Sequence, residues 1–263
     1  MSEADIVVHA AALKQVDAAE YNPFEAIKTN IIGAQNIISA CLNNNVKNVM
    51  ALSTDKACSP VNLYGSTKLA SDKLFISANN IKGKNKCKFS VIRYGNVMFS
   101  RGSVIPYFLK LKKDNIKLPV TDREMTRFSL TLMEGIQFVL KSIKMMTGGE
   151  LFVPKISSYR IMDLVKAISP KSKIQVTGIR PGEKIHENLI SVSDALNTIE
   201  LKDFFLVIPN SEVSPWKETK FKKHNNLKSL KYCKRNFSYS SNNNSHFLSI
   251  KEISQLIKKH IIS

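Results

Sequence analysis

Short apolar runs alternate with amphipathic stretches along the first hundred residues. Runs rich in β-branched residues at 5–9, 46–52 and 89–94 predict buried strands. Between them, apolar residues recur at helical spacing over 24–42 and 63–78. Strand, helix and strand in this order form βαβ units with a right-handed parallel pairing. The pattern therefore predicts an α/β fold built on a partial Rossmann-like parallel sheet.

The pattern changes after residue 101, where the elements become shorter and more mixed. Helical spacing and short apolar runs predict helices over 104–111, 131–145 and 160–168 and strands over 150–153 and 173–177. The turn-rich polar segment 178–187 is expected to enter a helix. This part of the chain predicts a smaller α+β lobe.

The last fifty residues begin with a basic segment. Residues 217–235 hold eight basic residues and one acidic residue with little apolar periodicity, which predicts an exposed connection. An amphipathic helix is expected over 249–261. We therefore predict three regions: 1–100, half of a nucleotide-binding domain with the catalytic residues; 101–215, mostly a substrate-binding lobe; and 216–263, the connection and final helix.

Composition narrows the class of protein. The 263 residues are 43% hydrophobic, and no apolar run approaches the roughly 18 residues that span a bilayer. No signal peptide is recognisable at the start, so a cytoplasmic location is expected and no membrane association. The four cysteines are scattered, without the spacing of a zinc site. We expect reduced thiols and no metal.

The net charge of +18 comes mostly from lysine, with 32 Lys and 7 Arg. The lysines are spread over the whole chain rather than clustered, which argues against a nucleic-acid partner. A basic surface also favours small anionic substrates such as nucleotide sugars. We expect a small-molecule substrate and no nucleic acid.

Four side chains with acid–base chemistry lie within fourteen residues at one strand-to-helix edge. Asp55 and Lys56 follow the run 46–52, and Tyr64 and Lys68 lie one helical turn apart at the start of the next helix. A neighbouring ammonium lowers the pKa of a tyrosine from about 10 toward neutrality, so that its phenolate can take a hydroxyl proton while hydride leaves the carbon. With 7 Tyr and 32 Lys in 263 residues, chance gives 7 × 32/263, or about 0.85, Tyr–Lys pairs at this spacing. The pair therefore favours alcohol oxidation only together with the strand end Ser53–Lys56 and the short loop that precedes the pair.

Eight motifs in order give the sequence a family resemblance. They are His9–Lys14, Lys28–Asn30, Leu52–Ala57, Asn62–Gly65, Arg93–Val97, Ser100–Val104, Met125–Phe128 and Ile179–Lys184. On these motifs the chain resembles the extended short-chain dehydrogenase/reductase superfamily, and within it the inverting UDP-N-acetylglucosamine 4,6-dehydratases. The resemblance covers essentially the whole chain.

The resemblance implies a role for each motif residue. Tyr64, assisted by Lys68, would deprotonate the sugar 4-hydroxyl, Lys56 would remove the C5 proton, and Asp55 would protonate the departing 6-hydroxyl. The implied cofactor is NADP or NAD, and the residues implied to bind it are Ala10, Ala11, Ala12, Lys14, Asn30, Tyr64 and Lys68. The residues implied to bind the UDP-sugar are Thr54, Asn96, Arg101, Arg180 and Glu183.

The sequence departs from the family at its beginning. The ten glycines contain no G-x-G, so the Gly-rich turn that holds the pyrophosphate is missing. The first strand resembles the family's fourth, so about 60 to 80 residues of the family pattern have no counterpart. We expect an open apolar sheet edge at 6–8, with the missing half of the domain supplied by another chain.

Three functions remain open at this point. The favoured one is a nucleotide-sugar dehydratase of surface-polysaccharide or glycoprotein-sugar synthesis, acting as a homo-oligomer by analogy with the family. The second is a nucleotide-sugar 4-epimerase, which needs Tyr64 and Lys68 but no elimination acid and base. The third is a non-catalytic remnant or partner subunit, inactive alone, which the missing Gly-rich turn would explain.

Overall fold

The computed structural model describes residues 3–210 and 214–262. The chain divides into two compact units whose segments interleave. Unit 1 holds residues 1–94, 136–155 and 188–238, and unit 2 holds residues 95–135, 156–187 and 239–263. The regions predicted from sequence are instead contiguous, with boundaries after residues 100 and 215.

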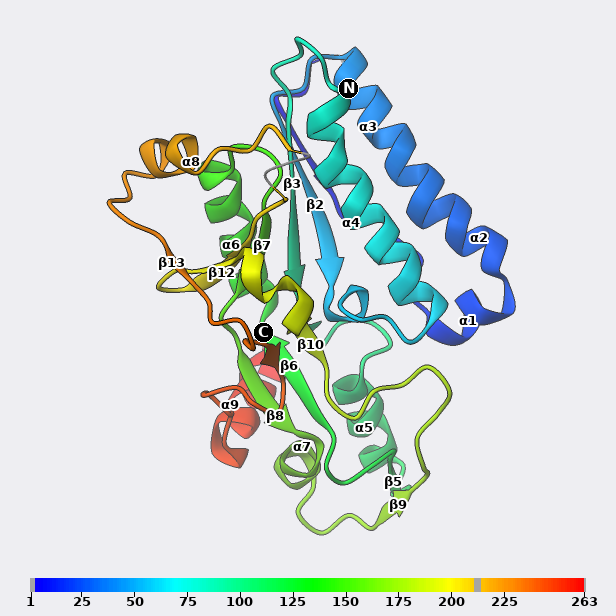
Figure 1. The fold of residues 1–263 in the computed structure, drawn as a ribbon. Helices are drawn as coiled ribbons and strands as arrows, with labels where there is room; N and C mark the ends of the chain where they lie inside the picture. Colours follow the sequence, from blue (N-terminus) through cyan, green and yellow to red (C-terminus); the bar gives the residue numbers. More distant parts are fainter. Residues whose placement is uncertain (1–2, 211–213, 263) are drawn as a thin grey trace. The chain divides into compact units, whose positions relative to one another are not determined.

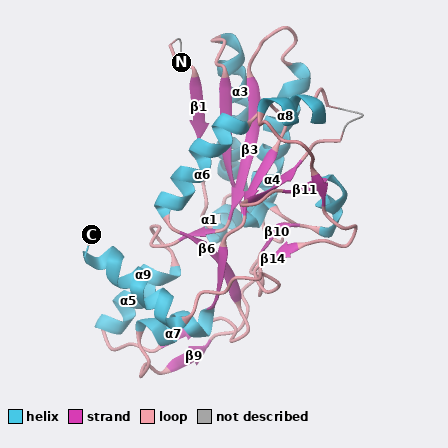
Figure 2. Cartoon of the chain, turned by 90° about the vertical axis from the view of Figure 1, so that its left-hand side faces the viewer, coloured by secondary structure: helices cyan, strands magenta, loops and turns pink. Residues whose placement is uncertain are grey.

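Unit 1 is built on a seven-stranded sheet in the order β1-β2-β3-β7-β12-β11-β13 (Figures 1 and 2). Its strands are β1 (Ile6–His9), β2 (Asn48–Thr54), β3 (Lys88–Tyr94), β7 (Leu151–Pro154), β11 (Thr198–Glu200), β12 (Phe204–Val207) and β13 (Lys231–Tyr232). The first four strands in the order pair in parallel, and the last three join antiparallel. The predicted α/β class and parallel sheet are confirmed.

Helices cover both faces of this sheet. They are α1 (Val16–Tyr21), α2 (Pro23–Ile27), the π-helical turn η1 (Lys28–Ile32), α3 (Gly33–Asn43), α4 (Leu63–Ile81), α6 (Leu132–Met145) and α8 (Glu218–His224). Helices α3 and α4 lie on one side, and α6 lies on the other (Figure 1). On the α6 side the core includes Met50, Ile92 and Phe152, against which Phe138 of α6 packs. Both faces of the central strands are therefore buried, as their continuous apolar runs require.

Strand β1 forms one end of the sheet and pairs only with β2 among the described strands. On one face, His9 is buried and its ring lies 5.3 Å from that of Phe75 on α4. On the opposite face, Ile6 is 50% exposed and Val8 is 43% exposed. The open apolar edge expected at 6–8 is therefore present in the structure (Figure 2).

Unit 2 contains short strands and helices around its own core. Its elements are β4 (Asn96–Val97), α5 (Val104–Lys113), β5 (Leu118–Val120), β6 (Thr126–Leu130), β8 (Ser157–Arg160), α7 (Ile161–Ile168), β9 (Ile174–Val176), β14 (Tyr239–Ser240) and α9 (Ile250–Ile262). The strands form a sheet β4-β6-β8 and a parallel pair β5-β9. Phe108 of α5, Leu164 of α7 and Ile253 of α9 meet in the core.

Two expectations about secondary structure are wrong. No helix follows the polar segment 178–187; strand β10 (Asn188–Ile190) does. Within the segment, the Ile185 carbonyl oxygen accepts a hydrogen bond from the Thr126 amide at 3.1 Å, which ties the segment to strand β6. The basic region 217–235 is also more than a connection, because α8 forms there and buries Phe221 against Trp216.

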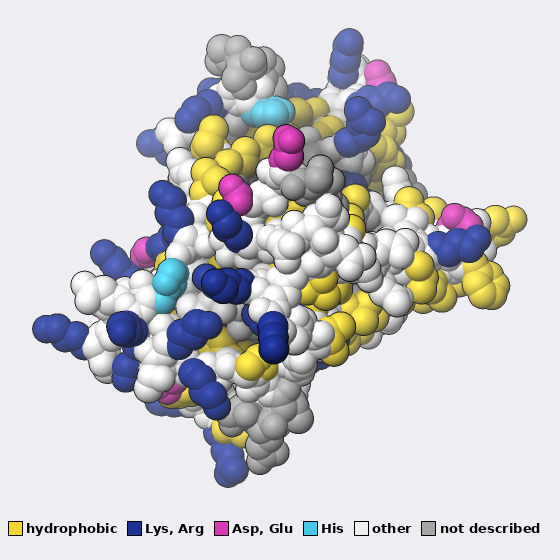
Figure 3. Space-filling view, turned by 90° about the horizontal axis from the view of Figure 1, so that it is seen from above, with side chains coloured by type: hydrophobic (Ala, Val, Ile, Leu, Met, Phe, Trp, Pro, Cys, Tyr) yellow, Lys and Arg dark blue, Asp and Glu magenta, His cyan; other side chains and the backbone are white. Residues whose placement is uncertain are grey.

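The surface carries the positive charge of the sequence. Lys and Arg side chains are spread over the face drawn in Figure 3, where Asp and Glu are fewer. Within residues 3–210 and 214–262, none of the helices combines the length and apolar character needed to cross a membrane. Over the same residues, His, Cys, Asp and Glu side chains form no group of three or more suited to a metal ion.

Candidate active site

The segment that follows strand β2 is a short 3-10 turn, η2 (Asp55–Ala57). Thr54, the last residue of the strand, caps this turn, and its hydroxyl oxygen accepts a hydrogen bond from the Lys56 amide at 3.3 Å. The turn thus places an acid and an amine at the carboxyl end of a parallel strand. Ligands of open α/β sheets bind at this edge.

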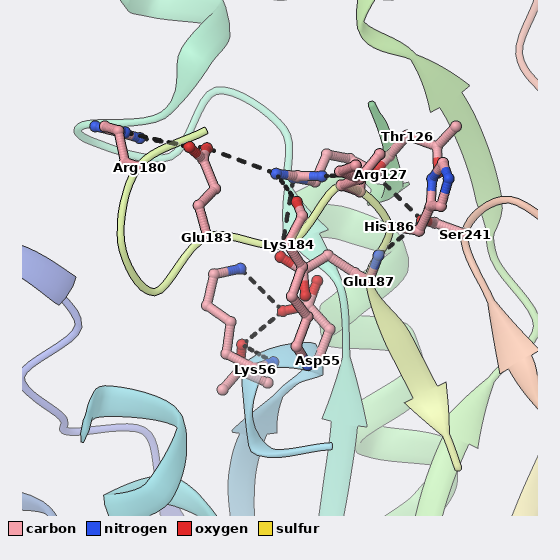
Figure 4. Close-up of polar contacts among 12 residues, drawn as sticks. Asp55, Lys56, Thr126, Arg127, Arg180, Glu183, Lys184, His186, Glu187 and Ser241 are labelled. Carbon is pink, nitrogen blue, oxygen red and sulfur yellow. Dashed lines mark hydrogen bonds and ion pairs between the residues drawn. The ribbon is translucent and has the colours of Figure 1, made fainter. Parts of the chain in front are cut away.

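Asp55 and Lys56 form a close ion pair (Figure 4). The carboxylate of Asp55 is 1% exposed, and its Oδ1 accepts hydrogen bonds from the Thr54 hydroxyl at 2.9 Å and from Lys56 Nζ at 3.1 Å. Its Oδ2 is buried with no hydrogen-bond partner in the part of the chain that the structure describes. Burial of an unsatisfied oxygen is costly. Asp55 Oδ2 is therefore available for a hydrogen bond with a bound ligand.

Tyr64 and Lys68 lie one turn apart near the start of α4, and both are buried. Asn62 caps this helix, since its Oδ1 accepts a hydrogen bond from the Gly65 amide at 2.8 Å. A Cβ on Gly65 would lie 2.2 Å from the carbonyl oxygen of Lys56. The absence of a side chain at Gly65 therefore lets the start of α4 pack directly on turn η2.

The pKa of Tyr64 differs in direction from the sequence expectation. Burial raises the pKa of Tyr64 above its usual value, and the charge of Lys56 and a hydrogen bond with Thr54 oppose this increase. The tyrosine is thus in its phenol form at neutral pH in the chain alone. The main cation acting on it is Lys56, the residue of the turn, rather than Lys68.

The Lys68 ammonium is directed to the end of β2. Its Nζ donates a hydrogen bond to the Leu52 carbonyl oxygen at 2.8 Å. Burial lowers the pKa of Lys68, and the charge of Asp72 opposes this shift. Lys68 therefore links α4 to strand β2, which leads into the turn of Asp55 and Lys56.

The proposed cofactor residues after β1 are held by Asn30. Ala10, Ala11 and Lys14 are exposed in the loop that follows the strand. Asn30 is 1% exposed and exchanges two hydrogen bonds with the Leu13 backbone, at 2.9 and 3.0 Å. Its Nδ2 also donates to Thr67 Oγ1 at 3.0 Å. Asn30 thus positions this loop against α4.

The residues present fit only one end of a nicotinamide dinucleotide. Tyr64 and Lys68 are in place beside a loop whose small side chains, Ala10 to Ala12, leave the backbone accessible. The ten glycines of the sequence provide no G-x-G turn for a pyrophosphate. Residues that could border a nicotinamide ring are therefore present, whereas the glycines of this sequence do not form the turn that usually binds the pyrophosphate.

Of the predicted nucleotide-sugar residues, Thr54 lies in unit 1, and Asn96, Arg101, Arg180 and Glu183 lie in unit 2. Asn96 Oδ1 is buried and has no hydrogen-bond partner among residues 3–210 and 214–262. Arg101 is exposed in the loop that follows β4. Arg180, whose side chain is 67% exposed, contacts both carboxylate oxygens of Glu183, with Nε at 3.3 Å and NH2 at 3.4 Å (Figure 4). The fork geometry suits an oxyanion such as a phosphate.

Arg127 holds the segment that carries Glu183. Its guanidinium donates hydrogen bonds to the carbonyl oxygens of Ile185 at 2.8 Å and Lys184 at 2.9 Å, and its NH2 lies 3.7 Å from Glu183 Oε1 (Figure 4). It is 9% exposed. Arg127 therefore fixes the backbone of the segment that carries Glu183.

Sequence reasoning missed a buried polar group in unit 1, centred on Asp72 of α4. Asp72 Oδ2 accepts hydrogen bonds from Ser53 Oγ at 2.8 Å and from Arg93 NH2 at 3.3 Å. Asp72 lies four residues after Lys68, just as Lys68 lies four after Tyr64, and this spacing is the signal that could have identified it.

Comparison with known proteins places these residues in context. Residues 1–209 match the family described as "Polysaccharide biosynthesis protein". The sequence is 50% identical over 258 residues to the UDP-N-acetylglucosamine 4,6-dehydratase (inverting) of Campylobacter jejuni subsp. jejuni serotype O:2, covering 98% of this chain and 77% of that protein.

Two further similar proteins carry names other than dehydratase. The sequence is 42% identical over 211 residues to a UDP-glucose 4-epimerase of Rickettsia canadensis, covering 79% of this chain and 62% of that protein. The X-ray structure of Pen from Bacillus thuringiensis superposes with a TM-score of 0.83 at 38% identity, covering 97% of this chain and 75% of that one.

Proposed function

The chain belongs to the polysaccharide biosynthesis protein family, and we propose that it is an inverting UDP-N-acetylglucosamine 4,6-dehydratase. The observation that carries this proposal is the Asp55–Lys56 pair, with its buried Oδ2, on the turn against which the start of α4 packs. Removal of water from a sugar needs an acid and a base in addition to the groups that oxidise a hydroxyl. The site offers both sets.

Oxidation is the first task of the residues. Tyr64, in its phenolate form, would take the proton of the sugar 4-hydroxyl. The charge of Lys56 favours this form against the effect of burial, and the Lys68 ammonium holds the region electropositive as negative charge develops on oxygen. Tyr64, Lys68 and the loop from Ala10 to Ala12 would hold a nicotinamide ring, which would accept the C4 hydride and later return it to C6. Because the hydride is used at C6 and none returns to C4, the 4-keto group persists in the product.

Elimination is the second task. The 4-keto group acidifies the C5 hydrogen, and neutral Lys56 removes it while Asp55 Oδ2 gives its proton to the departing 6-hydroxyl, which leaves as water. Proton exchange across the 3.1 Å contact between Lys56 and Asp55 resets the pair. A proton delivered to the opposite face of C5 inverts that centre, and the proton that Tyr64 took from the 4-hydroxyl balances it, so the turnover returns every group to its starting form.

Binding of the nucleotide sugar is assigned to the unit 2 residues. Arg180 and Arg101 would meet the diphosphate, Asn96 would use its buried Oδ1 as an acceptor, and Glu183 would hold ribose hydroxyls. Thr54 would orient the sugar next to Asp55. Ala10 to Ala12, Lys14 and Asn30 would border the nicotinamide of the cofactor, NADP or NAD.

The proposal extends to location and partners. We place the enzyme in the cytoplasm as a homo-oligomer in the synthesis of surface-polysaccharide or glycoprotein sugars. The exposed Ile6 and Val8 on β1 support association with another chain at this strand.

A 4-epimerase is the second candidate, because the 42% identity to the Rickettsia protein favours it. Epimerisation needs Tyr64 and Lys68 but leaves Asp55 and Lys56 without a task. The two activities are separable by product: an epimerase returns an isomer of unchanged mass, and a dehydratase returns a 4-keto-6-deoxy sugar lighter by one water. A non-catalytic protein returns neither.

The test is to incubate the purified chain with UDP-N-acetylglucosamine and NADP or NAD and to analyse the products by mass spectrometry. We expect loss of one water in the wild type and a rate at least about 100-fold lower in Lys56→Ala, the usual minimum contribution of a general base. Lys73→Ala removes an exposed lysine of the neighbouring helix α4 and is the control. Undiminished product from Lys56→Ala would exclude its role as base.

A further inference from the structure

The helix that carries Tyr64 and Lys68 has a third buried polar residue in the same line. Tyr64, Lys68 and Asp72 are spaced by four along α4, so they lie on one helix face. Their exposed fractions are 8%, 3% and 2%. A buried carboxylate without a structural or chemical task would be costly, and none of the dehydration steps uses Asp72.

The carboxylate of Asp72 spans two neighbouring strand ends. Ser53 of β2 and Arg93 of β3 are register partners in the parallel sheet, and both donate hydrogen bonds to Asp72 Oδ2. Ser53 directly precedes Thr54 and the Asp55–Lys56 pair. The position of this segment relative to α4 is therefore fixed at Asp72.

Lys68 provides a second attachment at the same place. Its Nζ donates to the carbonyl oxygen of Leu52, the residue before Ser53. The two attachments are one helical turn apart on α4 and one residue apart on β2. Together the two hydrogen bonds fix the position of α4 along β2 and the helix face that it turns toward the strand.

Charge gives Asp72 a second effect. Burial favours the neutral amine of Lys68 and so lowers its pKa, whereas the negative charge of Asp72 favours the ammonium. Burial raises the pKa of the Asp72 carboxyl itself, and the charges of Arg93 and Lys68 oppose this rise. Arg93 is in turn held by the Leu189 carbonyl oxygen at 3.2 Å.

We propose that Asp72 is a positioning residue of the active site, which keeps Lys68 in its ammonium form and locks α4 to the end of β2 through Ser53 and Arg93. The proposal rests on the proposed function for the reaction that Lys68 serves. The attachment itself and the charge state of Lys68 are properties of the chain and can be measured without substrate.

The test is an NMR titration of lysine labelled with ¹³C at Cε, with the Lys68 signal assigned by its loss in Lys68→Arg. In Asp72→Asn we expect the proton affinity of Lys68 to fall at least tenfold. Ser53→Ala removes a hydrogen bond but keeps the charge, so the proton affinity should change less than threefold. Asp72→Glu restores the charge and should recover most of the loss.

If Asp72→Asn does not fold, the double variant Asp72→Leu with Arg93→Met takes its place. It replaces the buried ion pair by apolar side chains. The same fall in Lys68 proton affinity is expected in this double variant. A folded variant of either kind with an unchanged Lys68 titration would overturn the proposal.

Activity provides the second readout. In Asp72→Asn we expect kcat for water loss to fall at least tenfold with KM changed less than threefold, and the alkaline limb of the kcat profile to move to lower pH because Lys68 loses its proton earlier. If the wild type makes no dehydrated product, the dehydratase proposal fails, while the NMR titration still decides the role of Asp72.

Discussion

Gly65 is the residue whose lack of a side chain allows the site to assemble. A Cβ there would lie 2.2 Å from the Lys56 carbonyl oxygen and 3.0 Å from Pro60 Cβ, and a backbone atom cannot move away cheaply. We expect Gly65→Ala to lower the free energy of unfolding by about 1–3 kcal/mol, the usual cost of overpacking, and to reduce water loss from the substrate because Lys56 is displaced.

Gly33→Ala is the matched control for this prediction. Gly33 has helical dihedral angles, and its added Cβ would meet only the Lys28 carbonyl oxygen at an ordinary 3.6 Å. Alanine should therefore stabilise α3 by about 0.5–1 kcal/mol. Urea unfolding of both variants measures the difference. Equal stability of the two variants would contradict the close approach at Gly65.

Single residues also show the limit of sequence reasoning. The spacing of Tyr64 and Lys68 correctly predicted that both lie on one face of a helix, since spacing determines position on a helix. It could not predict that burial raises the pKa of Tyr64, because burial depends on segments distant in sequence. Asp72 escaped notice for the same reason: its partners Ser53 and Arg93 are 19 and 21 residues away.

At the scale of elements, Glu150 joins the start of β7 to its surroundings. Its carboxylate is 0% exposed and accepts hydrogen bonds from Ser90 Oγ at 2.6 Å, the Gly148 amide at 2.9 Å and Trp216 Nε1 at 3.0 Å, and from both the amide and hydroxyl of Thr147. In Glu150→Gln an amide NH2 would face these donors. We expect a loss of at least about 3 kcal/mol of unfolding free energy, since several buried donors lose their acceptor.

The fluorescence of Trp216, the one tryptophan of the sequence, measures this unfolding directly. Glu200→Gln is the control, because Glu200 pairs with Lys155 and Lys231 at the surface and its side chain is 35% exposed. Such pairs contribute at most about 1 kcal/mol. A Glu150→Gln variant as stable as Glu200→Gln would show that the donors find other acceptors.

The contact between β1 and α4 predicts a pH dependence of stability. Burial, followed by the charge of Lys68, lowers the pKa of His9 below its ordinary 6.5. The unfolded chain therefore takes up a proton before the folded chain does as the pH falls. The unfolding free energy should decrease from about pH 6.5 downward, until the pH passes the lowered pKa of His9 in the folded state.

Replacement of His9 by Gln should flatten this part of the pH profile, measured by urea unfolding at pH 7, 6 and 5. Burial lowers the pKa of His186 as well, so His186→Gln and the double variant separate the two contributions. An unchanged slope in the double variant would assign the acid sensitivity to other groups.

The sequence pattern predicted the long helices better than it predicted short elements and the pairing of strands. Helices α3 to α7 and α9 formed where apolar spacing indicated them, because each buries one stripe of its own. Helix α8 was missed since Phe221 is its one buried apolar residue, too little for a periodic signal. The antiparallel strands β11 and β12 pair through residues close in sequence, but their three to four residues give no clear alternation.

At the scale of the whole molecule, interleaving of the units could not be predicted from a linear pattern. Unit 1 draws on three separate stretches of the chain and unit 2 on three others. Composition changes along a sequence indicate contiguous regions, whereas β7 returns to the first sheet after residues 95–135 have formed part of another unit. Such returns are determined by long-range strand pairing.

The open end of the first sheet makes a prediction for the whole chain. Ile6 and Val8 are 50% and 43% exposed on a strand that has a described partner on only one side, and such an edge pairs with other chains. We expect the purified chain to associate at micromolar concentration in sedimentation velocity. Val8→Lys should reduce this association, because a charged side chain on an edge strand opposes further strand addition. Ile116→Lys, which adds the same charge at a 52% exposed turn, should not. Association that persists unchanged in Val8→Lys would place the contact elsewhere on the molecule.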